Sequence, residues 1–153
     1  MNFLTPDAID VDGIEGDLRG PDAKAVVSFQ GVVRRDRTDK GELESVFYES
    51  YDVLAEKEMS RILAELAERY PGAEAMAHHR TGRIPVGETT LLLIVSAPER
   101  EAAFEACHFA LEQMKNRVPL WKKDVYKNGE GIWSHDSRET MLISDTVLTI
   151  PQS

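Results

Sequence analysis

The fold is decided by the stretch TTLLLIVSAPEREAAFEACHFALEQMKNRVPLWKKDVY, residues 89–126, because its periodicity changes twice. It opens with the apolar run Leu91–Val95, which predicts a buried strand over 89–96. Apolar residues then recur at three- and four-residue spacing, which predicts a helix. That helix is expected to end near Val118, because Pro119 disfavours helical geometry in the residue before it. An extended piece over 121–126 follows.

The start and the core face of this helix can also be predicted. Ser96-Ala97-Pro98-Glu99 has the S-x-x-E form of a capping box, which places the helix start there. The single cysteine excludes an intramolecular disulfide, and its place on the core face indicates a buried structural thiol rather than a sulfur carrier. The predicted core face consists of Ala103, Phe104, Cys107, Ala110, Leu111, Met114 and Val118.

Upstream of this stretch the same two periodicities predict more strands and a second helix. β-branched and apolar residues over Lys24–Val33 suit a strand that is buried on both faces. Residues 51–70 carry an amphipathic helical pattern, which Pro71-Gly72 ends. The other predicted segments are a polar loop over 35–41, strands over 44–50 and 74–79, a turn region over 82–87 and an extended piece over 141–150.

The resulting order, ββαββαβ, implies an α+β fold with a mixed or largely antiparallel sheet and two main helices on one face of it. With 153 residues and 42% hydrophobic content, the chain is long enough for one core. We therefore expect a single domain over 1–153. Within it, 1–23 is expected to be a loosely ordered entry with at most a short helical turn, and 140–153 a C-terminal tail.

Composition and charge exclude several classes of function. The net charge of −9 argues against general nucleic-acid binding, which needs a basic face. No apolar run reaches the roughly 18 residues that span a bilayer, and the N-terminus lacks a signal-peptide pattern, so a cytoplasmic location is expected. Positive charge is nevertheless concentrated between Lys115 and Lys127, where five cations face one anion.

The basic segment is the best candidate for chemistry. Lys115 falls in the last turn of the predicted helix, at the end of a partly apolar stripe. Pro119 then turns the chain and returns Lys122 and Lys123 toward the same region. Three converging cations suit a phosphate, since each attracts a nearby anionic charge by about 4 kcal/mol at an effective dielectric near 20. The alternative is that Lys115 only extends from the core edge into solvent. The stripe consists of Phe104, His108, Leu111 and Lys115.

Two other groups of polar residues have a functional and a simpler structural explanation. Arg34 lies where the first predicted strand ends, a common position for a functional group on a rigid support. The alternative is a solvated loop in which Asp36 and Asp39 are the partners of the arginines. His78 and His79 are neighbours on a strand and so point to opposite faces. The four histidines show no ligand spacing, and we predict no metal site.

Taken together, six motifs resemble the large, catalytic subunit of molybdopterin synthase, over roughly residues 24–135. The most specific of these motifs contains the pattern Lys-x-x-x-Pro-x-Trp-Lys, which starts at Lys115. The motifs are Phe29-Gln30-Gly31-Val32-Val33-Arg34, Tyr48-Glu49-Ser50-Tyr51, His79-Arg80-Thr81-Gly82, Val86-Gly87-Glu88, Ala103-Phe104-Glu105-Ala106 and Lys115-Asn116-Arg117-Val118-Pro119-Leu120-Trp121-Lys122-Lys123.

This resemblance implies an α/β hammerhead fold and a homodimer within a heterotetramer. The partner would be a small ubiquitin-like carrier whose Gly-Gly tail ends in a thiocarboxylate. Two sulfur transfers from it would convert cyclic pyranopterin monophosphate into the molybdopterin dithiolene, an activity of molybdenum cofactor biosynthesis. No cofactor beyond the substrate is implied, and a sulfur supply on the partner fits a chain without an exposed cysteine.

The resemblance also assigns roles to individual residues. Lys115 and Lys122 match the catalytic lysines. The remaining substrate contacts it implies are the backbone of Val32 and Val33 with Arg34, Arg100, Lys123 and Asp124. Residues expected at the pocket wall or the partner contact are Phe29, Glu99, Trp121 and Arg138.

One departure from the family pattern leaves other functions open. The family has a His-Arg pair before the second helix, whereas this chain reads Ala97-Pro98-Glu99-Arg100. Glu99 cannot replace an imidazole as a cation. One alternative is therefore a subunit that keeps the partner site without turnover. A second alternative is a noncatalytic module that binds an anion or a carrier tail, because similarity of fold alone does not establish activity.

Overall fold

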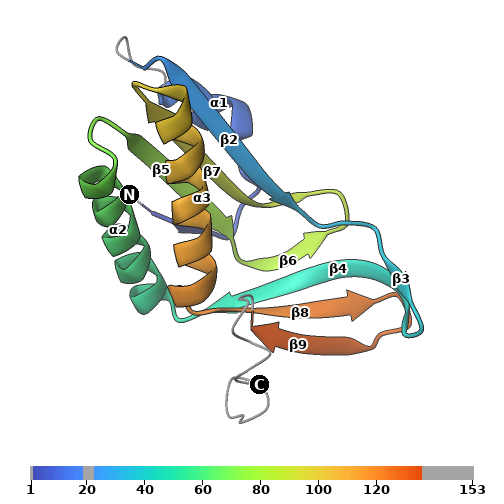
Figure 1. The fold of residues 1–153 in the computed structure, drawn as a ribbon. Coiled ribbons are helices and arrows are strands. Elements are labelled where there is room, and N and C mark those ends of the chain that lie inside the picture. The colour runs from blue at the N-terminus through green and yellow to red at the C-terminus, as the bar shows by residue number, and fades with distance from the viewer. Residues whose placement is uncertain (1, 19–22, 136–153) are drawn as a thin grey trace.

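The computed structural model describes residues 2–18 and 23–135. Within them the chain forms two sheets and three helices (Figure 1), which confirms the predicted α+β class. The predicted extended piece over 141–150 and the C-terminal tail lie outside the described residues. The elements are β1 (Leu4–Thr5), α1 (Val11–Asp17), β2 (Ala25–Val32), β3 (Arg37–Thr38), β4 (Gly41–Ser50), α2 (Asp52–Arg69), β5 (Glu74–Arg80), β6 (Gly82–Pro85), β7 (Thr89–Ala97), α3 (Arg100–Arg117), β8 (Leu120–Tyr126) and β9 (Gly131–His135).

The first sheet has the strand order β1-β5-β7-β2. β1 runs parallel to β5, and the other neighbours pair antiparallel, so the sheet is mixed as predicted. The apolar run of β7 lies inside the sheet, and alternate residues of it face two different layers. Leu91, Leu93 and Val95 belong to the core beneath α2 and α3, whereas Leu92 and Ile94 pack with residues around α1. The prediction that the two main helices share one face is confirmed for α2 and α3, while the short helix α1 packs on the other face of this sheet.

β2 differs from the strand that was predicted for this segment. The sequence favours burial on both faces, but β2 is an edge strand whose residues alternate between half-buried and exposed. Val26 and Val32, on the outward side, are 38% and 52% exposed. β-branched residues suit edge and central strands alike, so composition did not reveal the position of this strand in the sheet.

The second sheet is built around β4, which pairs antiparallel with β3, β6 and β8, while β9 pairs with β8. Its register places Tyr48 opposite Lys122 and Val46 opposite Asp124. Three of these strands were not predicted as strands: β3 lies in the polar loop, β6 lies in the 82–87 turn region, and β9 lies in a segment without a strand prediction. Strands this short carry too few residues for a clear alternating pattern.

The two long helices pack side by side over the first sheet (Figure 1). α2 turns a regular apolar face inward, as predicted, and the buried residues of α3 are mostly small. Phe104, predicted for the core face of α3, is instead 60% exposed. Small residues on the buried face let α3 approach the sheet closely, and the bulky ring lies outside this contact. The buried residues of α3 are Ala103, Ala106, Cys107, Ala110 and Met114.

The predicted capping box at Ser96–Glu99 is wrong. Ser96 is buried within β7, which continues to Ala97, and α3 begins only at Arg100. Glu99 is the N-cap residue and makes no side-chain cap hydrogen bond. The serine and glutamate of the motif therefore belong to different environments, because the strand extends farther than its apolar run.

The N-terminal segment is more ordered than the predicted loose entry. Phe3 is 1% exposed, and the backbone N–H groups of Phe3 and Leu4 donate to the Glu56 carboxylate of α2 at 2.8 Å each. β1 and α1 then add a strand and a seven-residue helix. Among the described helices, none has the length and apolar character needed to cross a membrane.

Candidate active site

A pocket of about 280 Å³ lies where the end of β2, the strands β4 and β8 and the last turn of α3 meet. We call it the lysine pocket. It brings together six of the residues that the sequence predicted to bind substrate, although they come from three separate segments of the chain. These residues are Val32, Val33, Arg34, Lys115, Lys122 and Asp124.

Lys122 and Asp124 enter the lysine pocket from the same face of β8. Because side chains alternate along a strand, residues two apart share a face. The Lys122 Nζ lies 3.6 Å from Asp124 Oδ1, and both side chains are about one third exposed, at 32% and 30%. The carboxylate therefore partly neutralises the ammonium group while both remain accessible from the pocket.

Lys115 reaches the lysine pocket from α3. The helix ends just after it, because Val118 adopts an extended backbone with φ −81° and ψ 126° in front of Pro119. β8 begins at Leu120, so the chain reverses within a few residues and brings Lys115 and Lys122 to one pocket. The predicted turn after the helix is thus confirmed.

The stripe that was predicted to lead to Lys115 is not continuous with the lysine pocket. Phe104 and His108, its first two members, line a different groove of about 500 Å³ between α3 and the end of α2. Tyr70 and Phe109 form an edge-to-face pair in that groove, with ring centroids 6.1 Å apart. Helical spacing placed the residues on one side of α3 but did not show which neighbours that side meets.

Arg34 borders the lysine pocket directly after β2. Its side chain is 84% exposed and lies 4.0 Å from the Asp36 carboxylate, so the predicted pairing with Asp36 and the predicted pocket position are both observed. The backbone before Arg34 is held firmly: the Val33 N–H donates to the Glu88 carbonyl at 3.0 Å, and its carbonyl accepts from the Gly87 N–H at 2.8 Å. The Val33 backbone is therefore already used within the chain.

A bulge and a close approach shape the same edge of the lysine pocket. The pairing of β2 with β7 shifts register between Gly31 and Val32. The Thr90 hydroxyl donates to the Gly31 carbonyl at 3.2 Å, and a Cβ at Gly31 would lie 3.0 Å from that hydroxyl oxygen. A side chain at this position would crowd Thr90, so glycine fits the bulge.

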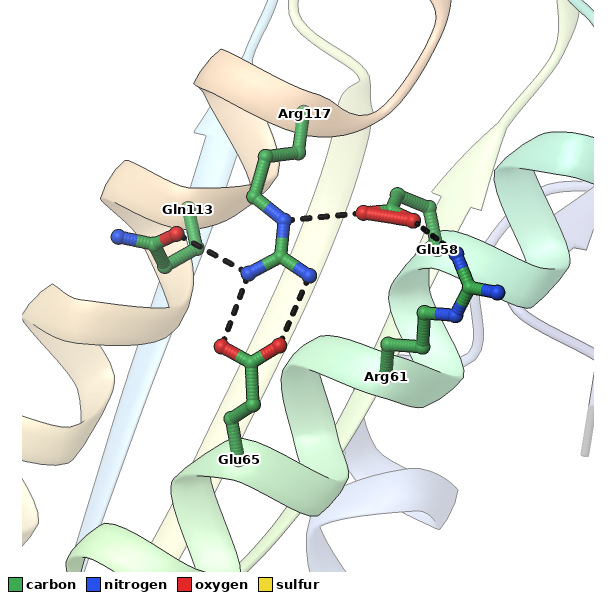
Figure 2. Close-up of polar contacts among 5 residues, drawn as sticks. All are labelled: Glu58, Arg61, Glu65, Gln113 and Arg117. Carbon is green, nitrogen blue, oxygen red and sulfur yellow. Dashed lines mark hydrogen bonds and ion pairs between the residues drawn. The ribbon is translucent and has the colours of Figure 1, made fainter.

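Three cations of the basic segment do not enter the lysine pocket. Arg117 bonds to carboxylates of α2 (Figure 2), and Lys127 pairs with Glu42. Lys123 lies on the opposite face of β8 from Lys122, with its Nζ 5.7 Å from the centre of the Trp133 ring. The prediction that Lys123 completes the pocket is therefore wrong, because strand alternation separates it from Lys122.

The predicted contacts before and at the start of α3 are also far from Lys115 within one chain. Arg100 opens the helix and Lys115 lies fifteen residues later, which corresponds to roughly 22 Å along the axis. Arg100 lies 4.0 Å from Glu101, and Glu99 and Arg100 are both exposed. Neither lines the lysine pocket of its own chain.

The other residues predicted for the pocket wall do not line the lysine pocket among the described residues. Trp121 lies on the outer face of β8 and packs edge-to-face with Tyr51, with centroids 4.8 Å apart. Phe29 is a partly buried residue packed against the core, two residues before Gly31 on β2. Arg138 lies outside the described residues.

Sequence reasoning did not identify Tyr48 as part of the lysine pocket. This buried tyrosine lines the pocket beside Lys122, and its ring meets His79 with centroids 4.6 Å apart. His79 is itself 1% exposed, and its Nδ1 lies 2.8 Å from the Arg80 carbonyl. Tyr48 shares a strand face with Val46, but only the register with β8 relates that face to Lys122.

The thiol of Cys107 is buried, as the sequence predicts. Cys107 is 7% exposed, and burial raises the pKa of its thiol, which disfavours the reactive thiolate. Within residues 2–18 and 23–135, no three His, Cys, Asp or Glu side chains are grouped to hold a metal ion.

The charges in the lysine pocket explain what it can bind. Arg34, Lys115 and Lys122 are opposed by Asp36 and Asp124, so the formal balance is slightly positive. Pairs near a protein surface contribute little, and an anionic ligand can take over the cations from these carboxylates. The arrangement therefore suits a phosphate or carboxylate group held by charge-assisted hydrogen bonds.

Three comparisons place the chain among known proteins. The family model described as MoaE protein matches residues 4–117. A relative from Pyrococcus abyssi named molybdopterin synthase catalytic subunit is 42% identical over 113 residues, which cover 74% of this chain and 75% of the relative. The crystal structure of molybdopterin synthase from Staphylococcus aureus aligns with a TM-score of 0.81 and 30% identity, over 86% of this chain and 95% of that one.

A second solved structure shares the fold at lower identity. It is a protein–protein complex of subunits 1 and 2 of the molybdopterin-converting factor from Helicobacter pylori. Its matching chain has a TM-score of 0.73 and 20% identity, with 92% of this chain and 97% of that chain covered.

Proposed function

Because the chain belongs to the MoaE protein family, whose curated relatives are named molybdopterin synthase catalytic subunits, we propose that it acts as this subunit and is a sulfurtransferase. Its substrate would be cyclic pyranopterin monophosphate. Two sulfur atoms, supplied one at a time, would complete the dithiolene of molybdopterin. We further propose that this reaction takes place in the cytoplasm and needs no cofactor beyond the substrate itself.

The observation that carries the proposal is the meeting of Lys115 and Lys122 in the lysine pocket, with Arg34 at its edge. The two lysines come from a helix end and a strand, supports that hold their backbones more rigidly than a loop does. Their ammonium groups can stabilise anions that are present in the substrate or develop during reaction.

We assign the cations different roles. Lys122 and Arg34 hold the substrate phosphate, which displaces them from Asp124 and Asp36. Lys115 contacts the thiocarboxylate end of the carrier tail or moves protons during sulfur attack. The half-buried position of Lys115 favours both tasks, because electrostatic interactions strengthen where water is partly excluded.

The sulfur would come from a small ubiquitin-like carrier with a Gly-Gly thiocarboxylate tail. The buried Cys107 makes this chain a poor sulfur donor by itself, which supports an external source. The Helicobacter pylori complex contains two different subunits, in keeping with such a pairing. We propose that two copies of this chain form a homodimer inside a heterotetramer. The distance of Arg100 and Glu99 from Lys115 means that only the second copy could bring them to the lysine pocket.

A reconstituted reaction tests this function. The purified chain is mixed with thiocarboxylated carrier and cyclic pyranopterin monophosphate, and dithiolene formation is followed by mass spectrometry. Lys115→Ala is expected to abolish the product while carrier binding stays measurable. Full turnover in that variant would refute the role of Lys115.

The same reaction separates the alternatives. Carrier binding by the unmodified chain without any product would favour a noncatalytic module that binds an anion or a carrier tail. The same result would fit a subunit that lost catalytic turnover because Glu99 replaces the histidine of the family pattern. Glu99→His then distinguishes these two, because a gain of product in that variant indicates a lost histidine rather than a different kind of site.

A further inference from the structure

We propose that Arg117 is a positioning residue for Lys115. Its guanidinium group joins the last turn of α3 to α2 and thereby keeps the Lys115 side chain directed at the lysine pocket. The inference rests on the proposed function in one respect only, which is that it explains how a lysine with a catalytic role is held in place.

Arg117 is the centre of a dense hydrogen-bond network (Figure 2). Its Nη1 and Nη2 donate to the two carboxylate oxygens of Glu65, both at 2.9 Å, which is a bidentate pair. Its Nε donates to Glu58 at 2.9 Å, and Nη1 also donates to Gln113 of α3 at 3.1 Å. Arg61 donates to the other oxygen of Glu58 at 3.1 Å. We call these five residues the Arg117 network.

The Arg117 network lies at the C-terminal end of α3 and therefore fixes the last turn of this helix. Arg117 is the last residue of the helix, and Val118 already has extended geometry. Terminal carbonyl groups lack partners within the helix, so a last turn opens more easily than a helix interior. Three hydrogen bonds from Arg117 to Glu58 and Glu65 hold that turn against α2, and Lys115 belongs to the same turn.

The direction of the two side chains follows from helix geometry. Residues two apart on an α-helix are separated by about 200° around the axis. With Arg117 drawn toward α2, Lys115 must leave the helix on nearly the opposite side. The lysine pocket lies on the side of Lys115. A rotation of the last turn that moved Arg117 off the α2 carboxylates would also turn Lys115 away from the pocket.

The network also separates charges that would otherwise interfere. Two arginines and two glutamates leave it formally neutral, so Arg117 does not compete with Lys115 for an anion in the pocket. Hydrogen bonds from Arg117 are the main cause that lowers the pKa of both Glu58 and Glu65. Both carboxylates therefore stay ionised near neutral pH and remain bonded to Arg117.

A purely structural role makes a different prediction, and Arg61 supplies the matched control. Arg61→Ala removes a guanidinium from the same network and from the same carboxylate, but Arg61 belongs to α2 and makes its bond within that helix. If the network only joined the two helices, Arg117→Ala would lower Tm and leave the Lys115 amine unchanged.

The test combines amine labelling with steady-state kinetics. Lys115 is modified with trinitrobenzenesulfonate and quantified in the proteolytic peptide, with and without inorganic phosphate as a pocket ligand. Arg117→Ala is expected to label several-fold faster and to lose most of the phosphate protection. Its kcat for sulfur transfer is expected to fall about tenfold or more with a smaller change in KM, since misplaced catalytic groups cost rate. Arg61→Ala should stay within about twofold of the unmodified chain in both assays.

Two further, conservative variants show whether an effect of Arg117→Ala arises only from misfolding. Arg117→Lys keeps the charge without the planar fork, and Glu65→Gln keeps an acceptor without the charge, so both should show intermediate labelling. Equal labelling and equal kcat in Arg117→Ala and Arg61→Ala, with only Tm reduced, would overturn the inference. Altered Lys115 labelling in Arg117→Ala would uphold it even if Lys115→Ala kept full turnover. In that case the proposed role of Lys115 in sulfur transfer fails, not its positioning.

Discussion

The two faces of β8 have different surroundings although their residues alternate along one strand. On the inner face, Lys122 and Asp124 form an ion pair that lines the lysine pocket. On the outer face, Trp121 packs on Tyr51, and Lys123 lies near the Trp133 ring. The two lysines are adjacent in sequence and separated by the sheet. Cations that are neighbours in the sequence therefore need not lie in the same site, because a strand directs them to opposite faces.

The largest expected effect contrasts the two neighbouring lysines. Lys122→Ala should lower the rate of product formation by about 10²-fold or more, because it removes a donor aimed at an anionic group. Lys123→Ala should stay within about twofold, since it faces away from the pocket. Both rates are measured in the reconstituted sulfur-transfer reaction. Comparable losses in the two variants would show that the outer face also takes part in catalysis.

A smaller effect is expected from the carboxylate of the inner face. Asp124→Asn removes the anion beside Lys122, so inorganic phosphate should bind about fivefold tighter at low salt, and the gain should shrink as salt screens the charges. Isothermal titration calorimetry measures this change. Glu49→Gln is the matched control, because Glu49 is an exposed carboxylate paired with the outer residue Trp121. An equal gain in both variants would mean that only the overall charge matters.

Trp133 gives the next effect, on stability alone. Its ring forms an edge-to-face pair with Phe47, with centroids 6.4 Å apart, and lies near the Lys123 ammonium. Trp133→Ala should lower the free energy of unfolding by about 1–2 kcal/mol, the range of such aromatic and cation–π contacts. The KM for substrate should not change. Urea unfolding and the kinetic assay measure the two quantities, and a raised KM would contradict the separation of the two faces.

The smallest effect concerns Glu42, the carboxylate that pairs with Lys127 just after β8. Hydrogen bonds from Lys127 and then Arg37 lower the pKa of Glu42 from 4.5 to about 2. A lowered carboxyl pKa gives stability that is present above pH 4.5 and is lost as the pH falls toward 2. Glu42→Gln should therefore lower Tm slightly at pH 7 and leave it unchanged near pH 2. Scanning calorimetry at both pH values tests this, and an equal decrease at each would exclude the ionic contribution.

The fold was largely predictable where the sequence period is long and regular. The apolar run of β7, the amphipathic pattern of α2 and the proline after α3 predicted those elements correctly. Short strands were missed, because β1, β3 and β6 are too brief to show a period and depend on pairing with distant segments. The Ser96 capping box failed for a related reason, since the pairing of β7 with β2 extends the strand beyond its apolar run.

The candidate site was predictable where a reversal of the chain brings its residues together. Pro119 returns the chain so that Lys115 and Lys122 meet, and the sequence predicted this turn correctly. Lys123 was assigned to the same pocket because its neighbour belongs there, and strand alternation overruled that assignment. Tyr48 and Thr90 were missed, since their contact with the pocket follows from strand register, which no local motif encodes.

The attachment of β1 also constrains the order in which the chain can fold during synthesis. Leu4 and Thr5 pair with His79 and Arg80, and the backbone N–H groups of Phe3 and Leu4 donate to Glu56. At about 5–20 residues per second, the ribosome makes this partner strand several seconds after β1. Phe3 therefore remains exposed on the nascent chain at first, and β1 can join the first sheet only once β5 has left the ribosomal exit tunnel. Chaperones that bind exposed aromatic residues have that interval in which to engage the N-terminus.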